Sequence, residues 1–256
     1  MNYNNNNELF LLGEIVKKNF SAKYKDSTLG IFWTILNPLL MMALFTIMFS
    51  TIFGGRIHNY PFYFLCGRCL FTFFSGASIV SMYALKGNKN ILQRTPAPKY
   101  IFVLGGIISE FLNFIISLIL LVGVMLVTHA PFYWDTIPFS IIPVISLSIM
   151  ITGLGFMLSI VCVFYSDVIH LWNVISTMVM YASAVFYPMD IIPEPYHQYL
   201  ILNPMFWVID QFRCFVYLGV FPEIGNMVNS ILLSLIILVL GIIIFKKYEK
   251  KVTMKF

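Results

Sequence analysis

Apolar runs of membrane length set the first limit on what this chain can form. Roughly 20 helical residues cross about 30 Å of hydrocarbon. The chain is 59% hydrophobic and only 11% charged, and its mean hydropathy is +0.86. Soluble domains carry about a quarter charged residues. We therefore expect an all-α integral membrane protein, with one transmembrane domain over residues 1–256 and six spans at 29–53, 62–85, 101–127, 137–164, 171–187 and 227–245.

Basic residues orient these spans. Thirteen of the sixteen Lys and Arg residues fall before the first span, in the loop 86–100 or after the last span. Short loops rich in Lys and Arg stay on the cytoplasmic side. This distribution predicts that both termini lie in the cytoplasm. The remaining Arg56, Arg68 and Arg213 then fall outside or near the outer face.

Two further segments do not fit a simple crossing. Residues 8–25 carry Leu9, Leu12, Val16 and Phe20 at helical spacing among basic positions, which predicts an amphipathic helix in the membrane interface. Residues 188–226 contain five prolines, and counting them as a span would place the C-terminal lysines outside. We expect a re-entrant or interfacial pair of short outer helices there.

The span 171–187 is short, so the bilayer thins or the helix stands upright.

The loop 86–100 contains Lys86, Lys89, Arg94 and Lys99 and no acidic residue. Its centre favours one or two helical turns, which Pro96 and Pro98 then end. Such a short helix between two spans could receive force from a soluble partner. The alternative is an ordinary positive-inside loop without a partner.

Isolated polar residues within the spans allow two interpretations each. Glu110 lies well inside an apolar run, where an acid is costly and faces protein or water. It could form a structural ion pair or a protonated, hydrogen-bonded carboxyl, or it could belong to a proton or ion pathway. Cys66 and Cys69 lie at i,i+3 spacing in an apolar segment, which favours packing over a redox pair.

The sequence lacks the common motifs of enzymes. It has no GxxxxGK[ST] phosphate loop, no HExxH and no GxSxG. The acids Glu110, Asp167 and Asp210 are scattered, and we expect no catalytic residue and no metal site. The net charge of +5 is explained by cytoplasmic ends that meet anionic lipid, so it does not indicate nucleic acid.

One stretch near the first span suggests a family. Lys23–Trp33 reads KYKDSTLGIFW and is followed by Asn37-Pro38-Leu39. This pattern resembles the start of type-2 ABC exporter permeases, and most closely the polysaccharide branch that exports O-antigen and teichoic acid. The order of later motifs is also similar over nearly the whole chain: an acid-x-x-His turn at 167–170, Ser183–Tyr187, and Asn203-Pro204 with Arg213 downstream. Ser166 and Ala184 stand where the family commonly has Arg and Pro.

The resemblance implies a function and partners. A permease of this kind works as two copies with two cytoplasmic ABC ATPase subunits, which hold ATP and Mg, and this chain itself binds no cofactor. It exports a lipid-linked glycan across the cytoplasmic membrane of a prokaryote. The loop 86–100 occupies the place of the family's coupling helix. The expected ATPase contacts are Ile91, Leu92 and Arg94, with secondary contacts from Asp167 and His170.

Two other functions stay open at this stage. An ABC exporter of drugs or lipids would share the same architecture. A membrane-embedded lipid-modifying enzyme would need polar catalytic groups that converge, and the sequence offers only scattered ones.

Aromatic residues are the candidates for the translocation path. A hydrated glycan must slide along protein, and rings offer broad, weak stacking surfaces. The expected path residues lie on the first and fifth spans: Trp33, Phe45, Phe49, Tyr181, Phe186 and Tyr187. The alternative, of equal weight, is that these rings pack helices together.

Overall fold

The computed structural model describes residues 5–25, 28–52, 57–193, 195, 197, 200 and 203–255, and within these ranges it contains helices and no strands. The α-helices are α1 (Asn5–Ala22), α2 (Phe32–Ile52), α3 (Tyr60–Lys86), α4 (Lys89–Arg94), α5 (Lys99–Val127), α6 (Ile141–Phe164), α7 (Val168–Ala182), α9 (Pro204–Arg213) and α10 (Ile224–Lys255). Short 3-10 turns η1 (Ile137–Ser140) and η2 (Met189–Ile191) and a π-helical turn η4 (Cys214–Leu218) complete them.

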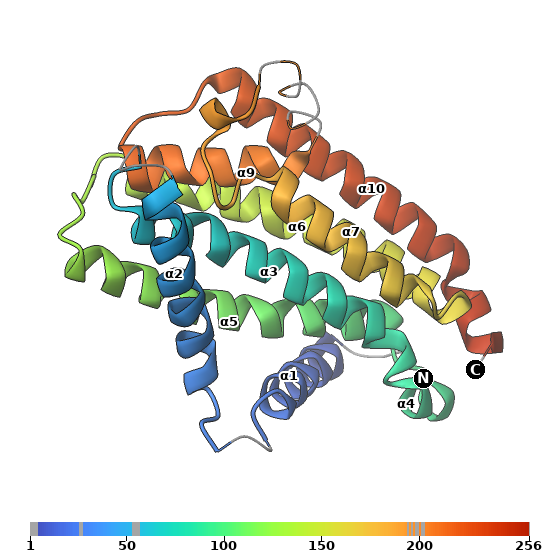
Figure 1. The fold of residues 1–256 in the computed structure, drawn as a ribbon. Coiled ribbons are helices and arrows are strands. Elements are labelled where there is room, and N and C mark those ends of the chain that lie inside the picture. The colour runs from blue at the N-terminus through green and yellow to red at the C-terminus, as the bar shows by residue number, and fades with distance from the viewer. Residues whose placement is uncertain are drawn as a thin grey trace.

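Helix α3 forms the centre of the bundle. It packs against α5 on one side and α6 on the other, and α10 packs against the far side of α6 (Figure 1). Phe62, Phe64 and Phe73 of α3 are fully buried, as are Phe102 of α5 and Phe215 of η4. Helix α2 crosses the bundle steeply and has no buried residue in its apolar window (Figure 1).

Small residues bring α6 and α10 into close contact. A side chain added at Gly241 would collide with the backbone of Gly153, and one at Gly153 would collide with Ile237 and Leu238. The Ser146 and Ser234 hydroxyls lie 2.9 Å apart across the same interface. Close backbone approach and interhelical hydrogen bonds are the usual means by which membrane helices associate. These two helices form the tightest pair in the fold.

The helix lengths support a membrane protein. Five helical segments are long and apolar enough to cross a bilayer: α2, α3, α5, α6 with η1, and α10. Helix α7 is apolar but has 15 residues, which gives about 23 Å at 1.5 Å per residue and falls short of the hydrocarbon thickness. The expected all-α membrane fold is confirmed, and the sixth span remains a prediction.

The segment between α7 and α10, expected as a re-entrant or interfacial pair of short outer helices, contains the buried helix α9. Helix α9 packs against α3, α6 and α10, and most of its side chains are buried. Its polar side chains have partners inside the bundle, since Gln211 Nε2 donates to Ser230 Oγ at 3.0 Å. Residues 194, 196, 198, 199, 201 and 202 lie outside the described part of the chain.

One end of the bundle gathers four separate parts of the chain. Lys86, at the end of α3, donates to the Ser166 hydroxyl in the α6–α7 turn at 2.8 Å. Lys18 of α1 donates to Asn88 beside α4 at 2.7 Å. Lys255 of α10 donates to the Phe164 carbonyl at 3.0 Å. The loop 86–100, the 165–170 turn, α1 and the end of α10 therefore share one end, as Figure 1 shows.

Helix α1 lies against α5, as a helix in the interface would. Ile15 is buried, and a Cβ atom at Gly105 of α5 would come within 2.6 Å of its Cγ2. Leu9 and Phe10 are exposed. The helix covers 5–22 instead of the expected 8–25, because the polar residues Asn5–Asn7 are helical and Lys23–Lys25 form a turn.

Candidate functional site

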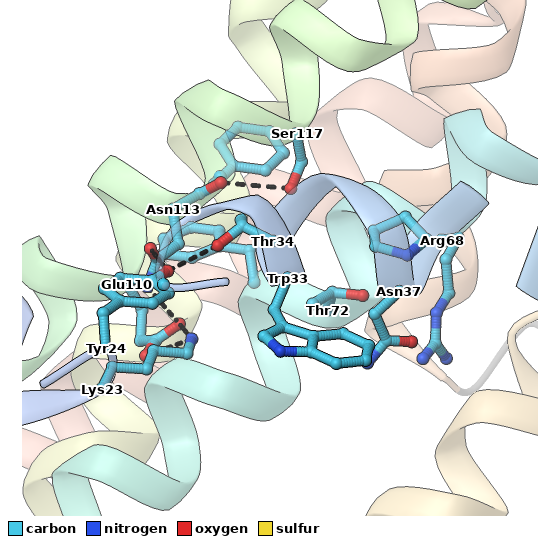
Figure 2. Close-up of a pocket in the computed structure, with 14 residues that line it drawn as sticks. Lys23, Tyr24, Trp33, Thr34, Asn37, Arg68, Thr72, Glu110, Asn113 and Ser117 are labelled. Carbon is cyan, nitrogen blue, oxygen red and sulfur yellow. Dashed lines mark hydrogen bonds and ion pairs between the residues drawn. The ribbon is translucent and has the colours of Figure 1, made fainter. Parts of the chain in front are cut away.

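A polar pocket opens where the α1–α2 connection meets α3 and α5 (Figure 2). Its volume is about 310 Å³. Its polar and aromatic lining includes Lys23, Tyr24, Trp33, Thr34, Asn37, Arg68, Thr72, Glu110, Asn113 and Ser117. Polar side chains at this depth are costly in lipid and mark functional or structural sites.

An ion pair closes one side of the pocket. Lys23 Nζ lies 3.0 Å from both carboxylate oxygens of Glu110, and Asn113 Nδ2 donates to Glu110 Oε2 at 3.1 Å. Gly76 of α3 makes room for this carboxylate, since a Cβ there would lie 2.9 Å from Glu110 Oε2. The geometry supports the structural ion pair proposed for Glu110. In the described residues it is the one ion pair found.

A second network ties the start of α2 to α5. The Tyr24 hydroxyl donates to Asn113 Oδ1 at 2.7 Å and lies 2.6 Å from the Thr34 hydroxyl. Lys23 and Tyr24, before the turn, are therefore bonded to α5, and Thr34, after it, is bonded to Tyr24. The junction of α1 and α2 moves with α5 unless these bonds break.

The opposite side of the pocket holds a cation without an acidic partner. Arg68 Nη1 donates to the Met180 sulfur at 3.5 Å, and no carboxylate pairs with Arg68 in the described part of the chain. Asn37 and Thr72 lie beside it in Figure 2, and neither side chain has a hydrogen bond within the described residues. The ring of Trp33 lies between the two sides and is 46% exposed. Arg68 thus lines the pocket, whereas the sequence suggested only a place near the outer face.

The segment after α7 is held by α9. Arg213 is buried and stacks over the Tyr63 ring at 3.7 Å from its centroid. The Asn203 side chain caps α9 by accepting from the Met205 amide at 3.1 Å and donates to the Ser183 hydroxyl at 2.8 Å. Asn203 and the downstream Arg213 therefore position Ser183–Val185.

The expected ATPase contacts all lie at the end of the bundle that carries α4, but they differ in exposure. Ile91, Arg94, Asp167 and His170 are exposed. Leu92 is 6% exposed and belongs to the hydrophobic core. Its side chain packs within this chain, so of the three expected contacts on α4 only Ile91 and Arg94 are exposed to a partner.

Most of the expected path rings pack against one another. The centroid of the Phe186 ring lies 4.6 Å from that of Phe45 and 5.5 Å from that of Tyr181, and Phe49 stacks on Phe45 at 5.9 Å. Phe186 is only 2% exposed, whereas Tyr181 is 54% exposed. Tyr187 is half-buried, and its hydroxyl donates to the Tyr181 carbonyl at 2.5 Å. Packing accounts for Phe186 within a single chain, while Tyr181 and Trp33 present free ring surface.

The family model for ABC-2 type transporters matches residues 11–217, which contain the pocket, α4 and the Arg213 contacts. The chain belongs to the ABC-2 type transporter family. Membership in this family implies an ABC ATPase as partner, and together with the apolar helices it makes the chain a multi-pass membrane permease.

Three relatives of this ABC-2 permease are named as export or transport proteins. It is 24% identical over 230 residues to the O-antigen export system permease protein RfbA of Myxococcus xanthus, covering 89% of this chain and 88% of that protein. It is 24% identical to the polysialic acid transport protein KpsM of Escherichia coli, covering 90% of each. The capsule polysaccharide export inner-membrane protein CtrC of Neisseria meningitidis (serogroup A) is 20% identical, covering 94% of this chain and 92% of that protein.

Sequence reasoning did not find the pocket of this permease. Glu110 and Arg68 were noticed singly, but their positions on different helices gave no sign that they line one cavity. The signal that could have found it is the polar character of Lys23, Asn37, Arg68, Thr72 and Glu110 beside otherwise apolar spans.

Proposed function

We propose that the chain is the membrane subunit of an ATP-driven exporter that moves a lipid-linked polysaccharide, such as O-antigen, teichoic acid or a capsular glycan, across the cytoplasmic membrane. The observation that carries this proposal is the full-length similarity to export permeases for O-antigen, polysialic acid and capsule polysaccharide. The working unit contains two copies of this chain and two copies of a cytoplasmic ABC ATPase, which binds ATP and Mg. Both termini lie in the cytoplasm, and α7 is a span too, the fifth in chain order, which brings the number of spans to six.

The geometry supports this assignment at the end of the bundle that carries α4. Four parts of the chain are joined into one surface there by three hydrogen bonds: Lys86–Ser166, Lys18–Asn88 and Lys255–Phe164. A load applied to Ile91 and Arg94 therefore reaches α1, α3 and α6 together. Such a bonded surface is what an ATPase would need to move several helices at once.

Translocation would follow exposed rings, with Tyr181 and Trp33 as its first candidates and Phe45, Phe49, Phe186 and Tyr187 as the packed layer behind them. The α9 segment with η2 forms the outer, re-entrant part. Residues 188–226 reach the bundle interior through Gln211 and Arg213, and backbone at such depth needs protein around it.

The experiment that tests the function is reconstitution. The permease is purified with the ATPase encoded for it, placed in liposomes and supplied with a lipid-linked glycan on the outer, ATPase-facing side. ATP-dependent arrival of glycan in the lumen is expected. If a drug or a plain lipid stimulates ATP hydrolysis and no glycan is transported, the result would favour an exporter of drugs or lipids.

A further inference from the structure

The side of the pocket around Arg68 has the properties of an anion site. Arg68 has no carboxylate partner among the described residues, and the carboxylate of Glu110 is already bonded to Lys23 and Asn113. A half-buried guanidinium without a counter-charge is costly in an apolar bundle unless an anion occupies the space beside it. The unpartnered Asn37 and Thr72 side chains add an amide and a hydroxyl donor to the same wall.

We propose that the pocket binds the phosphate-bearing headgroup and first sugar of the lipid-linked substrate, with Arg68, Asn37 and Thr72 on the phosphate and Trp33 against the sugar ring. This inference rests on the proposed function and names the part of the substrate that the permease recognises. Arginine presents a planar fork of donors that matches phosphate oxygens. The exposed Trp33 ring supplies the flat apolar surface between this wall and the Lys23–Glu110 pair (Figure 2).

The size of the pocket agrees with a headgroup and not with a polymer. Its 310 Å³ lies at the lower end of the range of roughly 300–1,000 Å³ that small-ligand sites occupy. The glycan beyond the first sugar and the lipid tail must therefore lie outside it. The pocket also borders the α1–α2 junction, so a bound headgroup would contact the segment that links the interface helix to the first span.

The test measures binding by the full-length permease in nanodiscs of phosphatidylcholine. The probe is a polyprenyl pyrophosphate that carries one sugar, and the fraction bound is measured by native mass spectrometry. Arg68→Gln should weaken binding at least about tenfold, as expected for the loss of a charge-assisted contact, and Arg68→Lys should weaken it less. Lys246→Gln, which removes an exposed cation on α10, is the matched control and should bind like the native chain.

Three further probes identify what is recognised. Inorganic pyrophosphate should compete with the lipid probe, and a polyprenyl glycoside without phosphate should bind weakly. If phosphatidylglycerol competes as well as the pyrophosphate lipid, the site takes any anionic lipid and the inference is wrong. Competition by glucuronate in place of pyrophosphate would also overturn it, because the site would then take a carboxylated sugar.

The same variants are tested for export, which separates this inference from the proposed function. If the native permease exports glycan and Arg68→Gln binds and exports equally well, the headgroup site is wrong and the function stands. If the native complex exports no glycan, the proposed function fails and the inference fails with it. Each variant is first shown to have the native elution profile and thermal midpoint. If Arg68→Gln fails this check, Thr72→Val and Asn37→Leu take its place under the same criteria. These two variants remove only neutral donors.

Discussion

Arg213 donates a hydrogen bond of 2.7 Å from Nη1 to the carbonyl oxygen of Ala184, and its Nη2 donates one of 2.7 Å to Val185. Ala184 has a φ of 51°, in the left-handed region that non-glycine residues seldom adopt. The arginine of α9 thus holds a strained turn at the end of α7. The side-chain bonds from Arg213 therefore fix a backbone conformation that proline, whose φ is locked at about −65°, could not adopt.

Replacing this arginine should loosen the turn. Arg213→Gln removes two charge-assisted hydrogen bonds, each of which contributes about 1.5–3 kcal/mol, and we expect a lower thermal midpoint and faster proteolysis near Ser183. Arg94→Gln, at an exposed position, is the control and should leave both unchanged. An unaltered cleavage rate near Ser183 in Arg213→Gln would show that the turn holds without the arginine.

Reversing the Lys23–Glu110 pair tests whether it is structural. Lys23→Glu alone places two carboxylates together and should destabilise the fold by about 1–3 kcal/mol, less than a fully buried pair would, because the Lys23 side chain is 46% exposed. Combining it with Glu110→Lys should restore part of the loss. The thermal midpoint of the detergent-purified protein measures both. A proton-pathway role for Glu110 would instead leave the double variant stable but change the pH dependence of transport.

The surface of α4 separates coupling from folding. Ile91→Asp and Arg94→Glu change exposed side chains and should leave the amount of folded permease unchanged while reducing ATPase-driven export several-fold. Leu92→Asp buries a charge in the core and should reduce folded protein. Co-purification with the ATPase and the yield of folded permease are compared for all three. Equal export by the native chain and Arg94→Glu would place the partner elsewhere.

The aromatic cluster gives a matched pair of variants. Phe186→Ala removes a buried ring and should cost about 3–5 kcal/mol, seen as lost folded protein. Tyr181→Ala removes an exposed ring and should reduce glycan export with normal abundance. Export is divided by the amount of folded protein in each case. If the ratio is native in Tyr181→Ala, this ring does not lie on the path.

Sequence patterns predicted the helices of this fold better than their contacts. The lengths of the apolar runs predicted the five helices that are long and apolar enough to cross a membrane. The charge rule kept 204–213 from being counted as a crossing, and α9 has only 10 residues. That segment is buried nevertheless, because Gln211 and Arg213 find partners on α10, α3 and the turn after α7. Periodicity alone gives no information about partners so distant in the sequence.

The same limit applies to the pocket and to α4. Lys23 and Glu110 are 87 residues apart, and only the packing of α1 against α5 makes their meeting necessary. Leu92 was expected at a partner interface because apolar residues survive desolvation there, and the same property suits a core position. Composition cannot distinguish these two places, while the direction in which the short α4 faces the bundle does.

The glycine contact between α6 and α10 has a consequence for how the chain is made. Gly153 is synthesised long before Gly241, so the α6 surface that receives α10 stays uncovered while the ribosome completes the intervening residues. During that interval Ser146 lacks its hydroxyl partner Ser234. The contact between α6 and α10 therefore forms only after α10 is made, and a nascent chain that stops before Ile224 leaves the Gly153 surface and the Ser146 hydroxyl of α6 without these partners.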